Sequence, residues 1–355
     1  MKFIKLCKFA VMFLTSCFAV CNLTAQPVGG QTEISDGSRE IINKLMDSSS
    51  TKPQEDWSAL PVNPASLLQT SYAILGKDEH SEFTHELIRI QWRAADPIDL
   101  YVIRPHGVER PPVVLYLYSY PSDTDRFRDD GWCQRATQGG FAAVGFVSAL
   151  TGQRYHAPRP MKEWFVSELQ ESLGTSTHDV QMILNYLEKR GDMDMNHVGM
   201  FGQGSGGAIA VLAAQADPRI KVLDLLNPWG DWPDWLKSSP QVPENERAAY
   251  LTPEFLQKVA ALDPVRYLPQ LRLKGLRVQQ VMNEPITPAD AKDKIAAAVP
   301  GPEQVARYKD EAAYREAWKV SGLSGWLREQ IRPSIAPLSA DSQQETPPTT
   351  AKAIR

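Results

Sequence analysis

The stretch that decides the fold is residues 198–207, which read Val-Gly-Met-Phe-Gly-Gln-Gly-Ser-Gly-Gly. An apolar segment that is typical of a buried strand, 197–201, runs into this glycine-rich turn. An apolar segment that is typical of a helix, 208–216, follows it. We therefore expect a strand, a sharp turn and a helix in direct succession.

The spacing of the glycines indicates which residue lies at the tip of this turn. Strand and helix nearly touch in such a turn, so the residues two before and two after the tip must be small. With Gly204 at the tip, these residues are Gly202 and Gly206, and both satisfy the requirement. With Ser205 at the tip, one of them is Gln203, whose side chain would collide with the helix. We therefore place Gly204 at the tip.

Strand and helix patterns alternate on both sides of this turn, and the first two expected strands form an antiparallel pair. Strands that alternate with helices favour a mostly parallel sheet covered on both faces. We predict an α/β fold with helices on both faces of the sheet and a small helical cap. The expected strands are 83–93, 98–104, 112–118, 141–147, 197–201, 220–226 and 276–282, and the expected helices are 131–138, 178–189 and 208–216.

Residues 198–207 resemble the nucleophile turn of the α/β-hydrolase fold family, specifically its dienelactone-hydrolase and acyl-esterase/prolyl-peptidase-like branches. Their pattern is a strand, Gly-x-Ser-x-Gly-Gly and a helix, and the resemblance continues over most of 95–310. It implies catalytic residues in the chain order Ser, acid, His. Gly204 stands where this pattern has the nucleophilic Ser, and Glu284, in the segment 284–288, stands where it has the acid.

The histidine that the resemblance implies is missing. No histidine follows His197, and the segment after Tyr308 reads Lys-Asp-Glu-Ala-Ala-Tyr. A serine hydroxyl is a weak nucleophile unless a base lies within hydrogen-bond reach, and losing even one member of a Ser-acid-His set costs several powers of ten in rate. We therefore expect a catalytically inactive protein with no intact catalytic set.

A binding site can survive this loss. The backbone N–H groups of Ser205 and Gly206 begin a helix, where an oxygen ligand is stabilised by the helix N-terminus. The family's His-Gly pair, which contributes to the oxyanion hole, reads Tyr118-Ser119 in this chain. We therefore predict that Tyr118, Ser119, Ser205 and Gly206 bind a small acyl, peptide or sugar ligand; a protein partner is the alternative.

Two other functions use the same turn. In the first, Ser205 acts as a displaced nucleophile of an esterase or peptidase, with His156 or His178 as its base. The plainer interpretations are that Ser205 fills the turn, that His178 is an exposed residue in the first turn of a helix, and that His156 is an ordinary lid residue. In the second, Gly202, Gly204 and Gly207 match the Gly-x-Gly-x-x-Gly pattern of dinucleotide-binding proteins, with Asp224 about 20 residues further on.

Three further features have a plain structural interpretation that we prefer. Trp229, Trp232 and Trp235 follow a strand and either line a ligand pocket or, as we expect, pack against one another in a cap. Cys133 lies on an expected helix and is expected to be a small buried residue. Without a histidine partner, Glu284 is expected to lie in water or to pair with an arginine.

The N-terminus has the features of an export signal over residues 1–25, with three lysines before an apolar stretch, 9–20. The segment 14–17 also resembles a bacterial lipobox, which would make Cys17 a lipid-anchored first residue. We predict a polar leader over 26–60, the α/β-hydrolase domain over 61–332 and a disordered tail over 333–355, and a location in the periplasm, outside the cell or lipid-anchored at the cell envelope.

Composition excludes several classes of function. The net charge of −4 with mixed signs along the chain does not indicate a nucleic-acid-binding surface. No apolar run of about 18 residues occurs outside the N-terminus, so only a lipid anchor would attach the protein to a membrane. After removal of the signal, Cys133 remains, and Cys21 also remains if Cys17 is the new first residue. A structural disulfide is therefore not expected. We expect neither a metal nor a cofactor.

Overall fold

The computed structural model describes residues 60, 71–92, 96–119, 124–150, 154 and 166–333. All of them belong to the second of two units of the chain, Asp56–Arg355. The predicted signal segment, the leader and the tail lie outside the described residues, apart from residues 60 and 333. No helix in the described part of the chain is both long and apolar enough to cross a membrane.

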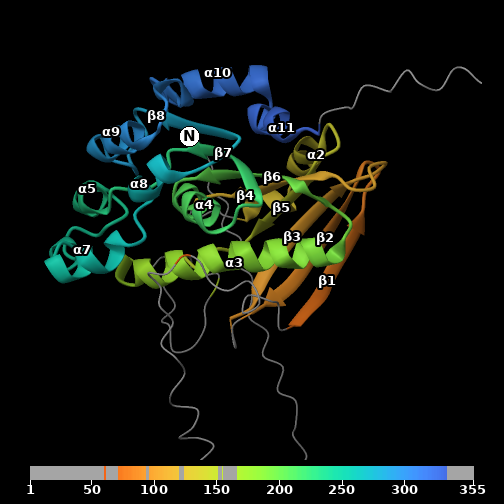
Figure 1. The fold of residues 1–355 in the computed structure, drawn as a ribbon, viewed down its shortest axis with the longest axis horizontal. Coiled ribbons are helices and arrows are strands. Elements are labelled where there is room, and N and C mark those ends of the chain that lie inside the picture. Colours follow the sequence, from red (N-terminus) through yellow and green to blue (C-terminus); the bar gives the residue numbers. More distant parts are fainter. Residues whose placement is uncertain are drawn as a thin grey trace, which may run out of the picture. The chain divides into compact units, whose positions relative to one another are not determined.

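A nine-stranded sheet with the order β1-β2-β3-β5-β4-β6-β7-β8-β9 organises this unit (Figure 1). The first three strands are antiparallel to their neighbours, and the strands from β5 to β9 in this order are parallel. The strands are β1 (Ser71–Glu79), β2 (Phe83–Gln91), β3 (Ile98–Pro105), β4 (Pro112–Leu117), β5 (Ala142–Phe146), β6 (Asp194–Gln203), β7 (Ile220–Leu226), β8 (Gly275–Val281) and β9 (Val305–Tyr308).

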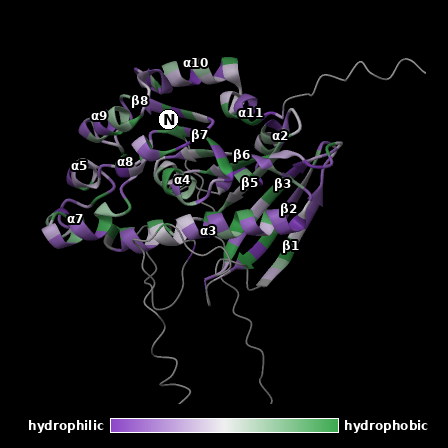
Figure 2. Ribbon diagram, in the orientation of Figure 1, coloured by the Kyte–Doolittle hydropathy of each residue, from purple (hydrophilic) through white to green (hydrophobic). Residues whose placement is uncertain are grey.

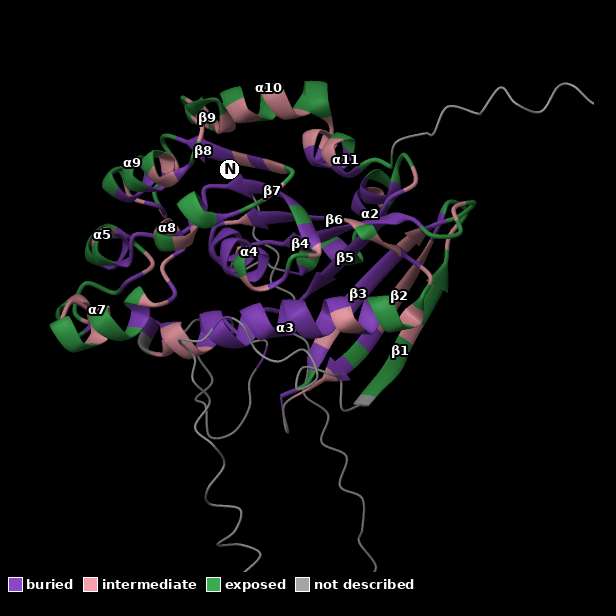
Figure 3. Ribbon diagram, viewed as in Figure 1, coloured by how far each residue is buried: buried purple, intermediate pink, exposed green. Residues whose placement is uncertain are grey.

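Every strand expected from the sequence is present, and β1 and β9 were not expected. β1 is an exposed edge strand that lacks the alternation of apolar and polar residues on which strand prediction depends (Figure 3). β9 has four residues, too few for any pattern to stand out. Both strands form because a neighbouring strand offers unpaired backbone groups, which a sequence pattern does not reveal.

Helices cover both faces of the sheet, as predicted. α3 and α4 pack on one face, and α2 and α11 pack on the other. α5, α6, α7 and α8 follow β7 and form the cap. The helices are α2 (Asp130–Thr137), α3 (Leu169–Arg190), α4 (Ser205–Ala216), α5 (Trp232–Ser238), α6 (Arg247–Tyr250), α7 (Pro253–Ala260), α8 (Pro264–Tyr267), α9 (Ala289–Ala298), α10 (Glu311–Ser321) and α11 (Gly325–Ile331), with a 3-10 turn, η2 (Asp125–Arg128), before α2.

The two faces of the sheet have different cores. Alternate residues of β4 point to opposite sides, so Leu115 and Leu117 pack under α3 and α4, while Tyr116 faces α2 and α11. The first core is mainly aliphatic, and the hydrophobic residues of α4 belong to it (Figure 2). The second core is rich in aromatic rings, including Phe127 and Trp132. The aromatic face is the one that continues into the cavity described below.

The tryptophans of the cap are buried, as expected from the plainer interpretation. Trp229, Trp232 and Trp235 are at most 1% exposed. The ring centroids of Trp229 and Trp235 are 4.6 Å apart, and those of Trp232 and Trp235 are 5.8 Å apart. These rings therefore stabilise the cap and are not available to stack on a sugar.

Cys133 also has its expected environment. It lies on α2, its thiol donates to the carbonyl oxygen of Phe127, and burial raises its pKa to about 12. A thiol that stays protonated at physiological pH is a poor nucleophile.

The start of α3 corrects one prediction. The helix begins at Leu169, nine residues before the expected start, so His178 lies in its middle and is buried, and the interpretation as an exposed first-turn residue is wrong. The added turns are rich in serine and threonine, which disfavour helix interiors because their hydroxyls compete for backbone groups. Here Thr177 Oγ1 donates to the carbonyl oxygen of Leu173 at 2.8 Å, and Ser176 Oγ accepts the N–H of Ala149, so both buried hydroxyls have partners within the protein.

A buried ionic cluster fixes α3 against the segment after β5. Arg154 forms ion pairs with Asp96 and with Asp179, and all three side chains are nearly inaccessible to solvent. The indole N–H of Trp92 donates to Asp179 at 2.7 Å. Two carboxylates in the protein interior need this guanidinium, because an uncompensated buried charge is strongly unfavourable.

We predict that Arg154→Met lowers the free energy of unfolding by about 3–5 kcal/mol, because it leaves two buried carboxylates without a cation. Arg89→Met is the control: Arg89 pairs with Asp99 at 2.9 Å but is half exposed, and its loss should cost about 1 kcal/mol or less. Urea denaturation of both variants provides the measurement. Equal losses in the two variants would contradict the role given to the buried cluster.

Candidate functional site

The structure places Gly204 at the tip of the turn between β6 and α4. Its backbone has φ +55° and ψ −117°, a conformation that side-chain-bearing residues rarely adopt. A Cβ on Gly202 would lie 2.6 Å from the carbonyl oxygen of Gly206, and a Cβ on Gly206 would lie 2.0 Å from that of Leu117. The two flanking positions therefore tolerate only glycine, which is the steric requirement used to place the tip from the sequence.

The space that a side chain at position 204 would need is already filled. A Cβ there would lie 2.5 Å from Ser119 Oγ, 2.8 Å from Ser119 Cβ and 3.1 Å from Trp229 Nε1. Ser119 follows β4, which neighbours β6 in the sheet. Its hydroxyl therefore occupies the region into which a residue at the tip would project.

The predicted ligand-binding groups at this turn contact one another. Ser119 Oγ lies 3.4 Å from Ser205 Oγ and accepts the backbone N–H of Ser205 at 3.5 Å. Ser205 is 1% exposed, and Gly206 packs against the backbone at Leu117. The helix N-terminus thus faces a hydroxyl of the protein itself. Tyr118, the fourth predicted binding residue, points away from this turn and lines the cavity described below.

Glu284, at the position of the acid, is held by its own loop. Its carboxylate accepts the backbone N–H of Ile286 at 2.6 Å and that of Thr287 at 3.1 Å. Lys292 Nζ lies 3.5 Å from the carboxylate and donates to the carbonyl oxygens of Val281 and Glu284. The partner is therefore a buried lysine on α9, and the expectation of water or an arginine is corrected. The spacing of Glu284 and Lys292, eight residues with a proline-containing turn between them, gives no signal for this pair.

The described histidines lie away from the tip. His80, His85 and His106 belong to the end of the sheet formed by β1, β2 and β3. His178 packs against the ring of Trp92, and His197 Nδ1 lies 2.6 Å from Asp194 at the start of β6, the opposite end of that strand from Gly204. His156 lies outside the described residues.

The dinucleotide-binding alternative has less support as well, because its acidic residue is not available to a ligand. Asp224, which would have to bind a ribose hydroxyl, is 1% exposed. Both of its oxygens accept from Arg277, at 2.9 and 2.6 Å, and one also accepts from Gln279 at 2.8 Å. The glycine pattern here reflects the contact of β6 with α4 rather than a phosphate-binding loop.

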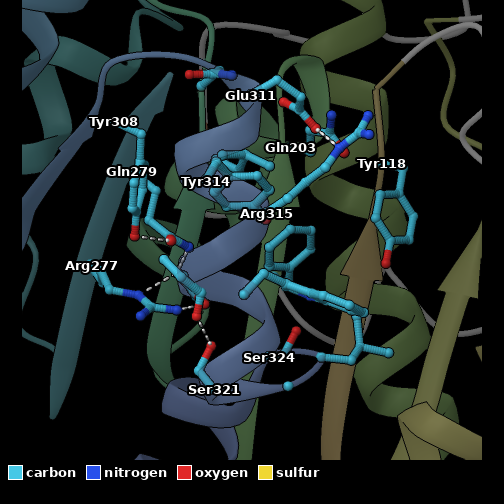
Figure 4. A pocket seen from close by; sticks show the side chains of 18 of the residues that line it. Tyr118, Gln203, Arg277, Gln279, Tyr308, Glu311, Tyr314, Arg315, Ser321 and Ser324 are labelled. Carbon is cyan, nitrogen blue, oxygen red and sulfur yellow. Dashed lines mark hydrogen bonds and ion pairs between the residues drawn. The ribbon is translucent and has the colours of Figure 1, made fainter. Parts of the chain in front are cut away.

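A cavity of about 440 Å³ opens beside this turn, on the aromatic face of the sheet. It lies between the ends of the central strands and α10, and Figure 4 shows Tyr314 and Arg315 of α10 facing Gln203 and Tyr118 across it. This cavity was not predicted from the sequence. The aromatic pair Tyr314 and Trp318, one helical turn apart, is the signal that could have revealed it.

The floor of the cavity is a chain of hydrogen bonds that is complete within the protein. Tyr308 donates its O–H to Gln279 at 3.0 Å, and Gln279 donates to Asp224, which Arg277 neutralises (Figure 4). Arg277 also lies 4.8 Å from the ring centroid of Trp326. A network whose members are all satisfied rigidifies a site.

Tyr118 forms one wall of the cavity, and its hydroxyl is the one polar atom of its side chain. The indole N–H of Trp132 donates to the Tyr118 hydroxyl at 3.2 Å, and burial raises the pKa of that hydroxyl well above its ordinary value. The guanidinium of Arg126 lies 4.1 Å from the centroid of the Tyr118 ring. Tyr118 therefore stays a neutral hydrogen-bond donor and supports a cation at the edge of the cavity.

Several solved structures have the same fold at low sequence identity. The acetyl xylan esterase from Paenibacillus sp. R4 is 15% identical with a TM-score of 0.58, over 76% of this chain and 98% of that chain. Acetyl xylan esterase 1 from Thermoanaerobacterium sp. JW/SL YS485 is 12% identical with a TM-score of 0.59, over 79% and 99%. A glucuronoyl esterase from Solibacter usitatus is 14% identical with a TM-score of 0.50, over 80% and 93%.

No protein-family model and no curated protein sequence matches the chain. Together with the sheet order, the structural neighbours show that the chain has the α/β-hydrolase fold, which confirms the fold class predicted from the sequence. At these identities the similarity establishes the fold and not the activity.

We predict that Glu284→Gln lowers the free energy of unfolding by about 1–3 kcal/mol, because one backbone N–H of its loop loses a charged acceptor. Glu244→Gln, at an exposed position, is the control and should leave stability unchanged. Thermal and urea denaturation measure both effects. A fully stable Glu284→Gln variant would show that the carboxylate is not required to hold its loop.

We also predict a loss of stability at alkaline pH. Burial raises the pKa of Tyr116 to about 12, from an ordinary value of 10. Below pH 10 the group is protonated in both states, and between about pH 10 and 12 only the unfolded chain loses the proton, so stability decreases as the pH rises. The decrease should be shallower in Tyr116→Phe and unchanged in Tyr72→Phe, whose ring is 57% exposed. Urea denaturation over this pH range measures the slopes, and identical slopes in all three proteins would refute the assignment.

Proposed function

We propose that this chain is a non-catalytic protein built on the α/β-hydrolase fold, and that it binds a small ligand in the cavity beside the former nucleophile turn. The observation that carries the proposal is the absence of a side chain at the tip of that turn and the contact of Ser119 with the tip. Gly204 provides no nucleophile, and the hydroxyl of Ser119 fills the space that a nucleophile would occupy. Restoring the missing side chain would therefore require a second change in the protein.

The chemistry of acyl transfer supports the same proposal. The nucleophile needs a base, and no described histidine adjoins the turn. The transition state needs free N–H donors, yet the Ser205 N–H faces the Ser119 hydroxyl. The carboxylate at the acid position is bound by backbone N–H groups. Among the described residues, the groups around this turn are thus either unsuited to hydrolysis or used to hold the structure.

The runner-up function, an esterase or peptidase that uses Ser205, has less support. Ser205 is buried, and its hydroxyl lies 3.4 Å from that of Ser119, which cannot act as a base at neutral pH. We further propose, from the N-terminal sequence, that the protein is exported and works at the cell envelope or outside the cell. A small ligand is favoured over a protein partner because the cavity has the size of a small-molecule site.

We predict that the mature protein hydrolyses neither p-nitrophenyl acetate nor p-nitrophenyl butyrate above the rate in buffer, and that a fluorophosphonate probe does not label it. Gly204→Ser should remain inactive and should lose about 1–3 kcal/mol of stability, because a side chain at this φ is strained and meets Ser119. Esterase assays, mass spectrometry and thermal denaturation measure these properties.

The double variant Ser119→Gly with Gly204→Ser removes the steric conflict and is the sharper test. It should regain stability relative to Gly204→Ser and still show no turnover, because no base is added. Labelling of Ser205 in the parent protein would establish the runner-up function instead. Efficient hydrolysis by the double variant would mean that a base reaches the turn from residues such as His156, and the proposal would then be wrong.

A further inference from the structure

The charged groups that line the cavity are not equally available to a ligand. Asp224 is neutralised by Arg277, and Glu284 is bound by backbone N–H groups and lies beside Lys292. Glu311 pairs with Arg315, one helical turn further along α10, at 3.2 Å. The carboxylates that line the cavity are thus already occupied by partners within the protein.

Two of the arginines that line the cavity, Arg126 and Arg135, have no strong ionic partner among the described residues. Arg126 makes no ion pair among the described residues, and the one described contact of its side chain is with the ring of Tyr118. Arg135 has its nearest described carboxylate, Asp129, at 3.9 Å, and both side chains are more than half exposed. Two cations without a strong partner at one cavity make it attractive to an anion.

Neutral donors line the same cavity. The side chain of Gln203 points into the cavity and forms no hydrogen bond with the described residues (Figure 4). The hydroxyl of Tyr118 accepts from Trp132, and no acceptor for its own proton lies in the described part of the chain. Arginine, amide and phenol donors together form a set that suits carboxylate oxygens.

The remaining walls are flat aromatic rings. Phe201 and Trp132 belong to the sheet side, and Tyr314 and Trp318 extend from α10. α10 contains no buried residue although its inner face carries these two rings, so they lie over the cavity without filling it. Rings of this kind bind the faces of planar or sugar rings.

We infer that the cavity binds a small carboxylic acid in which the carboxylate is attached to a ring, with the carboxylate held by Arg126 and Arg135 and the ring held by the aromatic walls. Two sources share this chemistry: an aromatic acid and a uronic acid. The inference rests on the proposed function, since it names the class of ligand for the same cavity. It goes beyond that function because it states the charge and the shape that the ligand must have.

Isothermal titration with four ring compounds, and with acetate, tests the inference. 4-Hydroxybenzoate and D-glucuronate represent the two sources, and 4-hydroxybenzamide and D-glucose are their neutral counterparts. At least one acid should bind, and its neutral counterpart should bind about tenfold more weakly or not at all, because it lacks the charge-assisted hydrogen bonds. Acetate, a carboxylate without a ring, should also bind more weakly than that acid.

Variants place the bound acid in the cavity. Arg126→Gln combined with Arg135→Gln should weaken binding of the acid by about tenfold. Arg128→Gln is the matched control: Arg128 lies in the same η2 turn, donates to the Tyr101 hydroxyl at 3.0 Å and does not line the cavity, so binding should be unchanged. Thermal denaturation confirms that each variant is folded.

The outcomes separate this inference from the proposed function. Equal binding of an acid and its neutral counterpart, binding that the double arginine variant leaves unchanged, or binding of none of the four compounds would overturn the inference. None of these results restores catalysis, so the proposed function would stand. Hydrolysis of p-nitrophenyl esters by the parent protein would overturn the proposed function, whatever the titrations show.

Discussion

Where β6 turns into α4, the backbone of the strand and the first turn of the helix are in van der Waals contact. A Cβ at Gly202 or Gly206 would lie 2.6 Å or less from a backbone carbonyl oxygen, so both positions require glycine. This contact forces residue 204 into a positive φ and directs it toward the ends of the strands. The geometry does not depend on the side chain at the tip, which explains why the turn has this shape with a glycine there.

Around this turn, groups that suit catalysis serve the structure. Ser119 fills the space at the tip and accepts the N–H that an oxyanion would need. Glu284 closes its own loop, and Lys292, a buried cation, ties that loop to β8. Burial lowers the pKa of Lys292, and the nearby carboxylate and two carbonyl oxygens offset this cost. Ser119 and Glu284, residues that a hydrolase would use for turnover, thus stabilise the structure here.

The cavity beneath α10 is lined by hydrogen-bond donors that have no acceptor among the described residues. Its floor of Tyr308, Gln279, Asp224 and Arg277 is satisfied internally, so the free donors lie at the walls. The same strand positions both sites, because Gln203 faces the cavity while the next residue, Gly204, forms the tip. The cavity and the turn are therefore adjacent in the sequence as well as in space.

The sequence by itself determined the local features: the strand, turn and helix around Gly204, the alternation that predicts the sheet, and the absence of a histidine after His197. These follow from periodicity and from steric rules that act within a few residues. The tertiary structure decided three other features. They are the contact of Ser119 with the tip 85 positions later, the burial of His178 in a longer α3, and the position of Tyr118 across the cavity from α10. Such contacts depend on how distant segments pack, and no local pattern in the chain encodes that packing.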